Sequence, residues 1–177
     1  ESRIENFQFL SLGAIQNHIP DRIARLAHCR QICADFVVTK KFDYVAVSDL
    51  DGTNSLLRKE AVRSCWMKTD WDACFANQRG LYYDIYALRH EVWCKQDYSQ
   101  DIAFLERNGM HPMKARRMAV LNKQRKIAPN SSWIEVDSAF GGLGIYTSKC
   151  FSISKYDYVD SKTSRTICEH VRFNEGI

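Results

Sequence analysis

Residues 45–52 read Val45-Ala46-Val47-Ser48-Asp49-Leu50-Asp51-Gly52, an apolar run that ends in two carboxylates and a glycine. A continuous apolar run, here starting at Tyr44, predicts a strand that is buried on both faces. Because α/β sheets bind ligands at the carboxyl ends of their strands, Asp49 and Asp51 are placed for chemistry. Two neighbouring negative charges need a cation or hydrogen-bond donors, and a hard divalent cation with water and phosphate oxygens is the natural partner. The alternative is that both side chains cap a turn supplied by Gly52.

Elements on both sides of this stretch indicate an α/β fold. Residues 7–12 predict a short strand, and a helix is predicted from Pro20-Asp21 to about Val37. Strand, helix and strand in this order predict a right-handed crossover in a mixed, mostly parallel sheet flanked by helices. Further strands are expected at 73–76, 84–88 and 144–146, a lateral helical segment at 99–126, and either a last strand or a helix at 166–173.

Length and composition limit the class of protein. With 177 residues and no repeat or flexible linker, the chain fits a single domain over 1–177, and 45% apolar with 26% charged residues argues against disorder. The net charge of +4 suits anionic ligands but is too small to indicate nucleic-acid binding. No apolar run is long enough for a transmembrane segment. Seven Cys, an odd number without CxxC pairs, favour reduced thiols and a reducing, cytoplasmic compartment.

Five polar or flexible residues elsewhere are candidates for substrate binding. Arg22 and Arg25 lie one turn apart on the predicted helix and suit a diphosphate, with a solvated helix face as the plain alternative. Asp84 interrupts an aromatic run and can hydrogen-bond to sugar hydroxyls, while the neighbouring tyrosines stack on a ligand or simply pack. Gly141 and Gly142 belong to a glycine-rich turn whose N–H groups can approach a ligand closely.

Cys168-Glu169-His170 follow a polar loop near the end of the chain. A carboxylate beside an imidazole can supply a general base or a metal ligand. The alternative is that both residues are structural.

A local basic cluster stands apart from these residues. It suits an anionic acceptor, a membrane surface or nucleic acid, and a solvated one-sided helix is its plain alternative. Its members are Lys114, Arg116, Arg117, Lys123, Arg125 and Lys126.

Two enzyme classes share the acidic turn at 49–52. Asp49-Leu50-Asp51-Gly52-Thr53 resembles the first motif of haloacid-dehalogenase-like phosphatases, which implies Asp49 as the nucleophile and Asp51 as the general acid/base. That motif normally ends the first strand of its domain, whereas here a predicted strand and helix precede it. The late acidic pair of that family is also missing from the sequence, so the phosphatase is the alternative prediction.

The second class is the metal-dependent glycosyltransferases of the GT-A fold, whose DxD motif Asp49-Leu50-Asp51 resembles. The resemblance extends to the helix at 21–36, the run at 83–89, Phe140-Gly141-Gly142 and Cys168-Glu169-His170. It is strongest for transferases of bacterial capsule pathways and of large DNA viruses. It implies that Asp49 and Asp51 hold Mn²⁺ or Mg²⁺ against the diphosphate of a nucleoside diphosphate sugar, with a UDP-sugar favoured. The acceptor would then be a hydroxyl group of a glycan or glycoconjugate.

The same resemblance implies roles for the remaining candidates. Gly141 and Gly142 would line the donor-sugar and acceptor pocket. Glu169 and His170 occupy the place of a Glu-Asp pair whose Asp is the base in inverting members, which leaves the base open between them; a retaining enzyme needs neither. GT-A enzymes begin with a βα unit that we do not find ahead of residue 7, so few nucleoside-contacting residues are expected.

The expected location is the cytoplasm, or the host cytoplasm if the source is viral. A sugar-binding module without catalysis is a third class.

Overall fold

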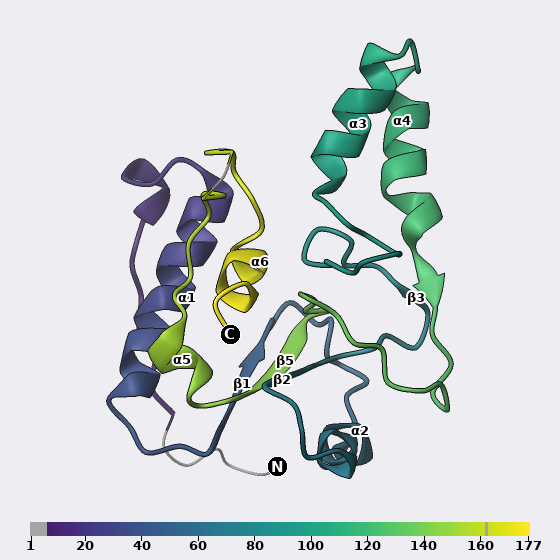
Figure 1. Ribbon diagram of the computed structural model, residues 1–177. Coiled ribbons are helices and arrows are strands. Elements are labelled where there is room, and N and C mark those ends of the chain that lie inside the picture. The colour runs from purple at the N-terminus through teal and green to yellow at the C-terminus, as the bar shows by residue number, and fades with distance from the viewer. Residues whose placement is uncertain (1–6, 162) are drawn as a thin grey trace.

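The computed structural model describes residues 7–161 and 163–177 and shows an α/β protein (Figure 1). Its main sheet has three strands in the order β1-β5-β2, namely β1 (Tyr44–Ser48), β5 (Leu143–Thr147) and β2 (Ala73–Phe75). Both outer strands run antiparallel to β5, so β1 and β2 point the same way. Strands β3 (Leu81–Tyr82) and β4 (Arg125–Lys126) form a second antiparallel sheet.

Helices surround the main sheet and extend beyond it (Figure 1). The 17-residue helix α1 (Arg22–Val38) packs against α5 (Cys150–Ile153) and α6 (Glu169–Asn174). Helices α3 (Tyr98–Arg107) and α4 (Pro112–Ala119) form a hairpin that projects away from the other elements. The short elements are η1 (Ile15–Asn17), α2 (Lys59–Ser64), η2 (Cys65–Met67) and η3 (Leu121–Lys123).

Local sequence signals explain where the helices begin. Asp21 caps α1, because its Oδ1 accepts the N–H of Ala24 at 2.8 Å. The predicted helical segment at 99–126 is confirmed as the α3–α4 hairpin, in which Asp97 caps α3 and Gly109 makes the turn with φ +82°. Strands predicted at 44–47, 73–76 and 144–146 are confirmed as β1, β2 and β5, and the stretch at 166–173 contains a helix.

Several parts of the predicted topology are wrong. Residues 7–12 form no strand, since the described residues provide no partner for them, and the expected crossover into β1 is therefore absent from the described chain. Residues 84–88 form a turn instead of a strand, because Asp84 Oδ1 accepts the N–H of Ala87 at 3.2 Å. The described strands pair only in antiparallel fashion and not as a mostly parallel sheet, because β5 returns between β1 and β2. Strand β1 lies at the edge and is half-buried on one face only, not buried on both.

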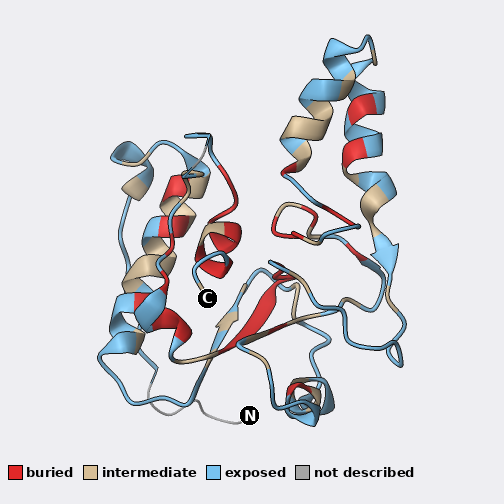
Figure 2. Cartoon of the chain, in the orientation of Figure 1, coloured by how far each residue is buried: buried red, intermediate tan, exposed pale blue. Residues whose placement is uncertain are grey.

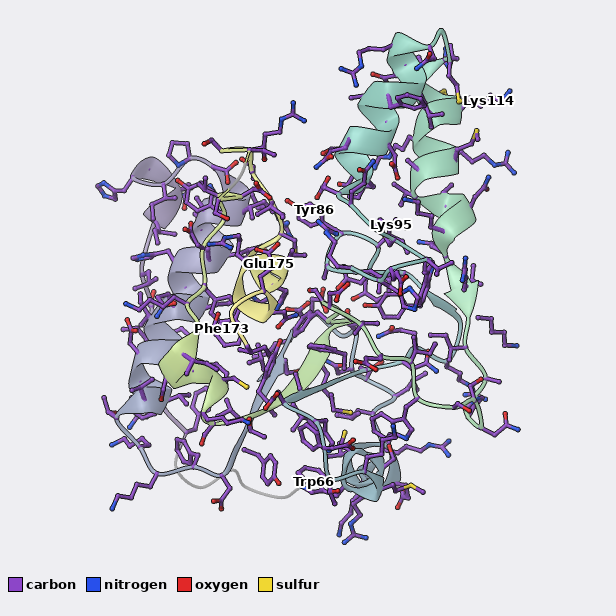
Figure 3. All side chains as sticks on the ribbon, viewed as in Figure 1. Trp66, Tyr86, Lys95, Lys114, Phe173 and Glu175 are labelled. Carbon is purple, nitrogen blue, oxygen red and sulfur yellow. The ribbon has the colours of Figure 1, made fainter. Side chains whose placement is uncertain are left out.

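The largest apolar core lies between the main sheet and helices α1, α5 and α6, where buried residues concentrate in Figure 2. Tyr146 of β5 is fully buried, and its ring meets Phe173 of α6 edge-on at a centroid distance of 5.5 Å. Phe173 lies inside this core (Figure 3). A second apolar cluster lies at the base of the hairpin, and it includes Tyr82, Ile85, Leu88, Trp93, Cys94 and Ala139.

Asn174 fastens α6 to the sheet. Its buried amide donates to Ser138 Oγ at 2.9 Å and to the carbonyl of Ala139 at 3.2 Å, and its Oδ1 accepts the hydroxyl of Tyr146 at 3.2 Å. Two separate segments, residues 138–139 and Tyr146 of β5, are therefore held to the last turn of α6 by one side chain.

We expect Asn174→Ala to lower the free energy of unfolding by about 2–4 kcal/mol, because the Tyr146 hydroxyl and the Ala139 carbonyl would lose their partners in a buried setting. Urea unfolding measures this change. Asn130→Ala, at an exposed turn position, is the control and should shift stability by about 0.5 kcal/mol at most. Equal effects of the two substitutions would contradict the role given to Asn174.

Candidate functional site

Arg30 joins the two acidic motifs that the sequence separates. Its Nη2 lies 3.0 Å from Asp49 Oδ1 at the end of β1, and its Nε lies 3.1 Å from Glu169 Oε1 in the first turn of α6. The side chain of Arg30 is 16% exposed and that of Glu169 only 4%. A charge-assisted bridge in so dry a setting fixes both carboxylates relative to α1.

Aromatic rings pack against the ion pairs of Arg30. The guanidinium carbon of Arg30 lies 5.1 Å from the ring centroid of Phe140, and Phe140 stacks on His170 with centroids 3.7 Å apart. Burial lowers the pKa of Arg30, but the charge of Glu169 and the hydrogen bond to Asp49 outweigh it and raise the pKa above its ordinary value. Arg30 is therefore a permanent cation at the centre of the site.

The glycine-rich turn lies directly against the acidic turn. The N–H of Asp49 donates to the carbonyl of Gly142 at 2.9 Å. Asn54 reinforces this contact, since its Nδ2 donates to the carbonyls of Gly142 at 2.7 Å and Asp49 at 3.1 Å. The structure thus brings together the two turns that the sequence predicts to line the site.

Asp84 accepts a hydrogen bond from the backbone of the glycine turn. Its Oδ2 accepts the N–H of Gly141 at 3.0 Å, while its Oδ1 holds Ala87. Burial raises the pKa of Asp84 in spite of these two hydrogen bonds, and the charges of Glu169 and Asp49 act in the same direction. Both carboxylate oxygens are used within the chain, so Asp84 fixes the backbone of Gly141 and Ala87.

Asp51 is exposed and forms a tight local turn. Its Oδ1 accepts the N–H of Thr53 at 3.1 Å and the Thr53 hydroxyl at 2.6 Å. These hydrogen bonds lower the pKa of Asp51. The Asp51 side chain therefore caps the turn, and its carboxylate stays ionised.

The donor set limits which metal the site can hold. Within residues 7–161 and 163–177, no group of three or more His, Cys, Asp or Glu side chains is arranged to hold a metal ion. Asp49 and Asp51 each use only Oδ1 in hydrogen bonds among these residues. Each of these two carboxylates keeps one oxygen free of hydrogen bonds, and together they do not form a complete protein cage for a cation.

The structure does not bring Arg22 or Arg25 to the acidic turn. Arg25 donates to the carbonyls of Ile19 at 2.9 Å and Pro20 at 2.6 Å, and Arg22 is exposed. They precede Arg30 by eight and five residues, or about 12 and 8 Å along the helix. Arg30 instead occupies the place expected for them.

A signal for Arg30 is present in the sequence of α1. Ala27 and Ala34 are the buried residues three before and four after it, which places Arg30 on the apolar face of the helix. A charged residue on a core-facing stripe has to find a partner inside the protein. That pattern distinguishes Arg30 from Arg22 and Arg25.

His170 lies beside Glu169, with its Nε2 3.9 Å from Glu169 Oε1. It is 2% exposed, and neither ring nitrogen has a hydrogen-bond partner among the described residues. Burial, with a smaller effect of the Arg30 charge, lowers the pKa of His170 well below its ordinary value. The imidazole is therefore neutral and packs between Phe140 and Tyr156.

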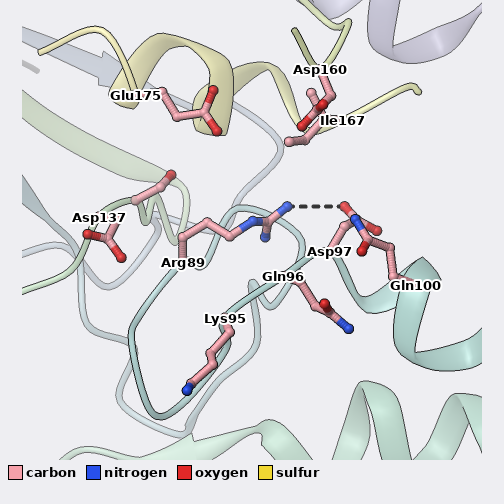
Figure 4. A pocket seen from close by; sticks show the side chains of 10 residues that line it. Arg89, Lys95, Gln96, Asp97, Gln100, Asp137, Asp160, Ile167 and Glu175 are labelled. Atoms are coloured by element: carbon pink, nitrogen blue, oxygen red, sulfur yellow. Dashed lines mark hydrogen bonds and ion pairs between the residues drawn. The ribbon is translucent and has the colours of Figure 1, made fainter. Parts of the chain in front are cut away.

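A cavity of about 260 Å³ lies between the base of the hairpin and the C-terminal end of α6 (Figure 4). Arg89 and Asp97 form a buried ion pair of 3.2 Å in its wall, and Gln96, Asp137 and Glu175 are among its other lining residues. Glu175 follows Glu169 by six residues, which is about 9 Å along the helix axis. Polar groups thus line a hollow at the end of α6 away from Glu169.

Comparison with known proteins adds no assignment: no protein-family model matches the chain, and no curated protein or solved structure is similar to it. The chemistry of the site is therefore inferred from its geometry.

No helix in the described part of the chain is both long and apolar enough to cross a lipid bilayer.

We expect Gly141→Ala to destabilise the protein by about 1–3 kcal/mol, because Gly141 has φ +65° and a Cβ atom there would lie 2.6 Å from the backbone oxygen of Ala76. Thermal or urea unfolding measures the loss. Gly80→Ala is the matched control, since nothing lies within 4 Å of its Cβ position. A Gly141→Ala protein as stable as the Gly80→Ala protein would show that the turn is not constrained.

The neutral state of His170 predicts a pH effect on stability. In the unfolded chain His170 takes up a proton below about pH 6.5, whereas in the folded protein its pKa is held well below that value. The unfolded state therefore binds more protons, and this group makes the free energy of unfolding fall as the pH drops below about 6.5.

We expect His170→Phe, which keeps a ring against Phe140, to reduce the loss of stability between pH 7.5 and 5.5 by up to about 1.4 kcal/mol per pH unit. Urea unfolding at each pH measures it, and His18→Phe at an exposed position is the control. Parallel pH profiles for the wild type and His170→Phe would rule the effect out.

Proposed function

We propose that the protein is a metal-dependent glycosyltransferase that moves a sugar from a nucleoside diphosphate sugar, with a UDP-sugar favoured, to a hydroxyl of a glycan or glycoconjugate. The observation that carries the proposal is the contact of Asp49 and Glu169 through Arg30. It joins an acidic turn suited to a cation and a diphosphate with a buried carboxylate suited to a proton transfer.

Asp49 and Asp51 would hold Mn²⁺ or Mg²⁺ through their open carboxylate oxygens, and the donor diphosphate would complete the ligand set. A bound cation of this kind supplies Lewis-acid stabilisation of the charge that develops on the leaving diphosphate. Arg30, a buried cation at hydrogen-bond distance from Asp49, adds positive charge on the same side. We assign to Arg30 the phosphate-directed role expected for Arg22 or Arg25.

Glu169 is the better candidate for the base of an inverting transfer. It would accept the proton of the acceptor hydroxyl as that oxygen forms its bond to the sugar and the diphosphate leaves. Glu169 Oε1 is oriented by Arg30. The His170 ring is packed against Phe140, and among the described residues its nitrogens make no hydrogen bond; Nε2 lies 3.9 Å from Glu169 Oε1, beyond hydrogen-bond distance. The sequence leaves the base open between these two residues, and the geometry favours Glu169.

The phosphatase alternative has less support. It needs Asp51 to act as general acid/base, which is best served by a raised pKa. The hydrogen bonds from Thr53 lower the pKa of Asp51 instead. An ionised, exposed carboxylate suits a cation ligand better than a proton donor.

The cavity at the end of α6 is a suitable place for part of an acceptor sugar. Carboxylate and amide side chains such as Asp137, Glu175 and Gln96 match the donor and acceptor pattern of sugar hydroxyls. It lies at the opposite end of the short helix that begins with Glu169.

Thermal unfolding with UDP and Mn²⁺ tests the proposal. The wild type should be stabilised only when both are present, by about 2.7 kcal/mol at one hundred times the dissociation constant. Asp51→Asn should lose this stabilisation, and the exposed Asp70→Asn is the matched control. No stabilisation of the wild type by any UDP- or GDP-sugar with Mn²⁺, or metal-independent binding, would contradict it.

The Glu169→Gln variant separates the binding of UDP and Mn²⁺ from the transfer of the sugar. It should keep the Mn²⁺-dependent stabilisation by UDP and lose the transfer of sugar to an acceptor. Hydrolysis of a phosphomonoester with Mg²⁺ by the wild type, without affinity for nucleotide sugars, would favour the phosphatase.

A further inference from the structure

The solvent side of α4 has an unusual composition. Ala115 and Ala119 are buried on the side of α4 that packs on α3, while Arg116 is exposed at the flank. The exposed residues farther round are Met113, Lys114, Arg117, Met118 and, in η3, Leu121. We call these five residues the outer face of α4. A soluble helix normally presents charged and polar groups to solvent, whereas three of these five side chains are apolar.

The apolar members of the outer face are strongly exposed. Met113 is 78% exposed, Leu121 55% and Met118 41%. The α3–α4 hairpin projects away from the other elements, so no described segment covers this face (Figure 1). Lys114 extends outward at the hairpin (Figure 3).

The hairpin and the residues that follow it, through η3 and β4, carry an excess of positive charge. Residues 98–126 contain seven Lys and Arg against two Asp and Glu, a net charge of +5, while the whole chain has +4. Lys123 pairs with Asp101, but Lys114 and Arg117 form no ion pair within the described residues. Unpaired basic groups therefore lie among the exposed apolar ones.

We propose that the outer face of α4 docks on an anionic lipid bilayer, with Lys114 and Arg117 at the headgroups and Met113, Met118 and Leu121 at the boundary with the acyl chains. Lipid headgroups attract basic side chains, and the acyl boundary accepts apolar ones, so a bilayer matches both properties of the face. Nucleic acid or an acidic glycan would match only the basic residues.

Binding to vesicles tests the proposal independently of the glycosyltransferase activity. We expect the wild-type chain to co-sediment with vesicles of phosphatidylglycerol and phosphatidylcholine, and far less with phosphatidylcholine alone. Binding should weaken with added salt because screening acts on the basic residues.

Two double variants separate the charge from the apolar contact. K114Q/R117Q should bind the mixed vesicles about 25-fold more weakly, because each basic group near an anionic surface accounts for about fivefold. M113S/L121S should bind at least about tenfold more weakly with no change of charge. K59Q/R63Q, at two exposed basic positions of α2, is the charge-matched control and should bind like the wild type.

Circular dichroism checks that each variant is folded, and none of the substitutions touches the buried Ala115 or Ala119. Absence of wild-type binding to the anionic vesicles would overturn the proposal. So would an equal loss in K59Q/R63Q, or full binding by M113S/L121S. Tight binding of a single-stranded RNA by the wild type without vesicle binding would assign the face to nucleic acid instead.

Discussion

The largely buried charge of Arg30 is the constraint on which the arrangement of the site depends. Withdrawing a guanidinium from water costs several kcal/mol unless carboxylates are in contact with it, and removal of one partner leaves an uncompensated charge. Asp49 and Glu169 are those partners, so the end of β1 and the start of α6 have to lie beside α1. Phe140 covers the guanidinium, which brings the glycine turn to the same place.

The parts of the fold that local sequence determines are the parts that the sequence predicts well. Asp21 caps α1 and Gly109 makes the turn between α3 and α4. Both signals depend on a few neighbouring residues. The order and direction of strands depend on contacts that are distant in the chain. Strand β5 returns some 70 residues after β2 to pair with it and with β1, and no local pattern around Gly144 specifies that return.

Asp84 shows why the candidate site could be predicted only in part. Its aromatic surroundings are typical of a strand, yet its own side chain accepts the N–H of Ala87 and closes a turn. The acidic turn, the glycine turn and Glu169 are identifiable as candidate site residues because their residue types are unusual for their positions. Residue type alone does not distinguish Arg30 from the other arginines of α1; its position between Ala27 and Ala34 on the buried face of the helix does. Only the fold shows which carboxylates pair with it.

The shared carboxylate of Asp49 ties cation binding to nucleotide binding in the proposed activity. One oxygen of Asp49 already faces the charge of Arg30, so a divalent cation on the other oxygen would place two positive groups close together. Repulsion between Arg30 and the cation would disfavour binding of the cation alone. A diphosphate between the two positive groups would attract both of them. This balance agrees with a donor set of two carboxylates without a third His, Cys, Asp or Glu among the described residues. In the proposed activity, Asp49 and Asp51 would therefore hold a divalent cation more strongly with the nucleoside diphosphate present than without it.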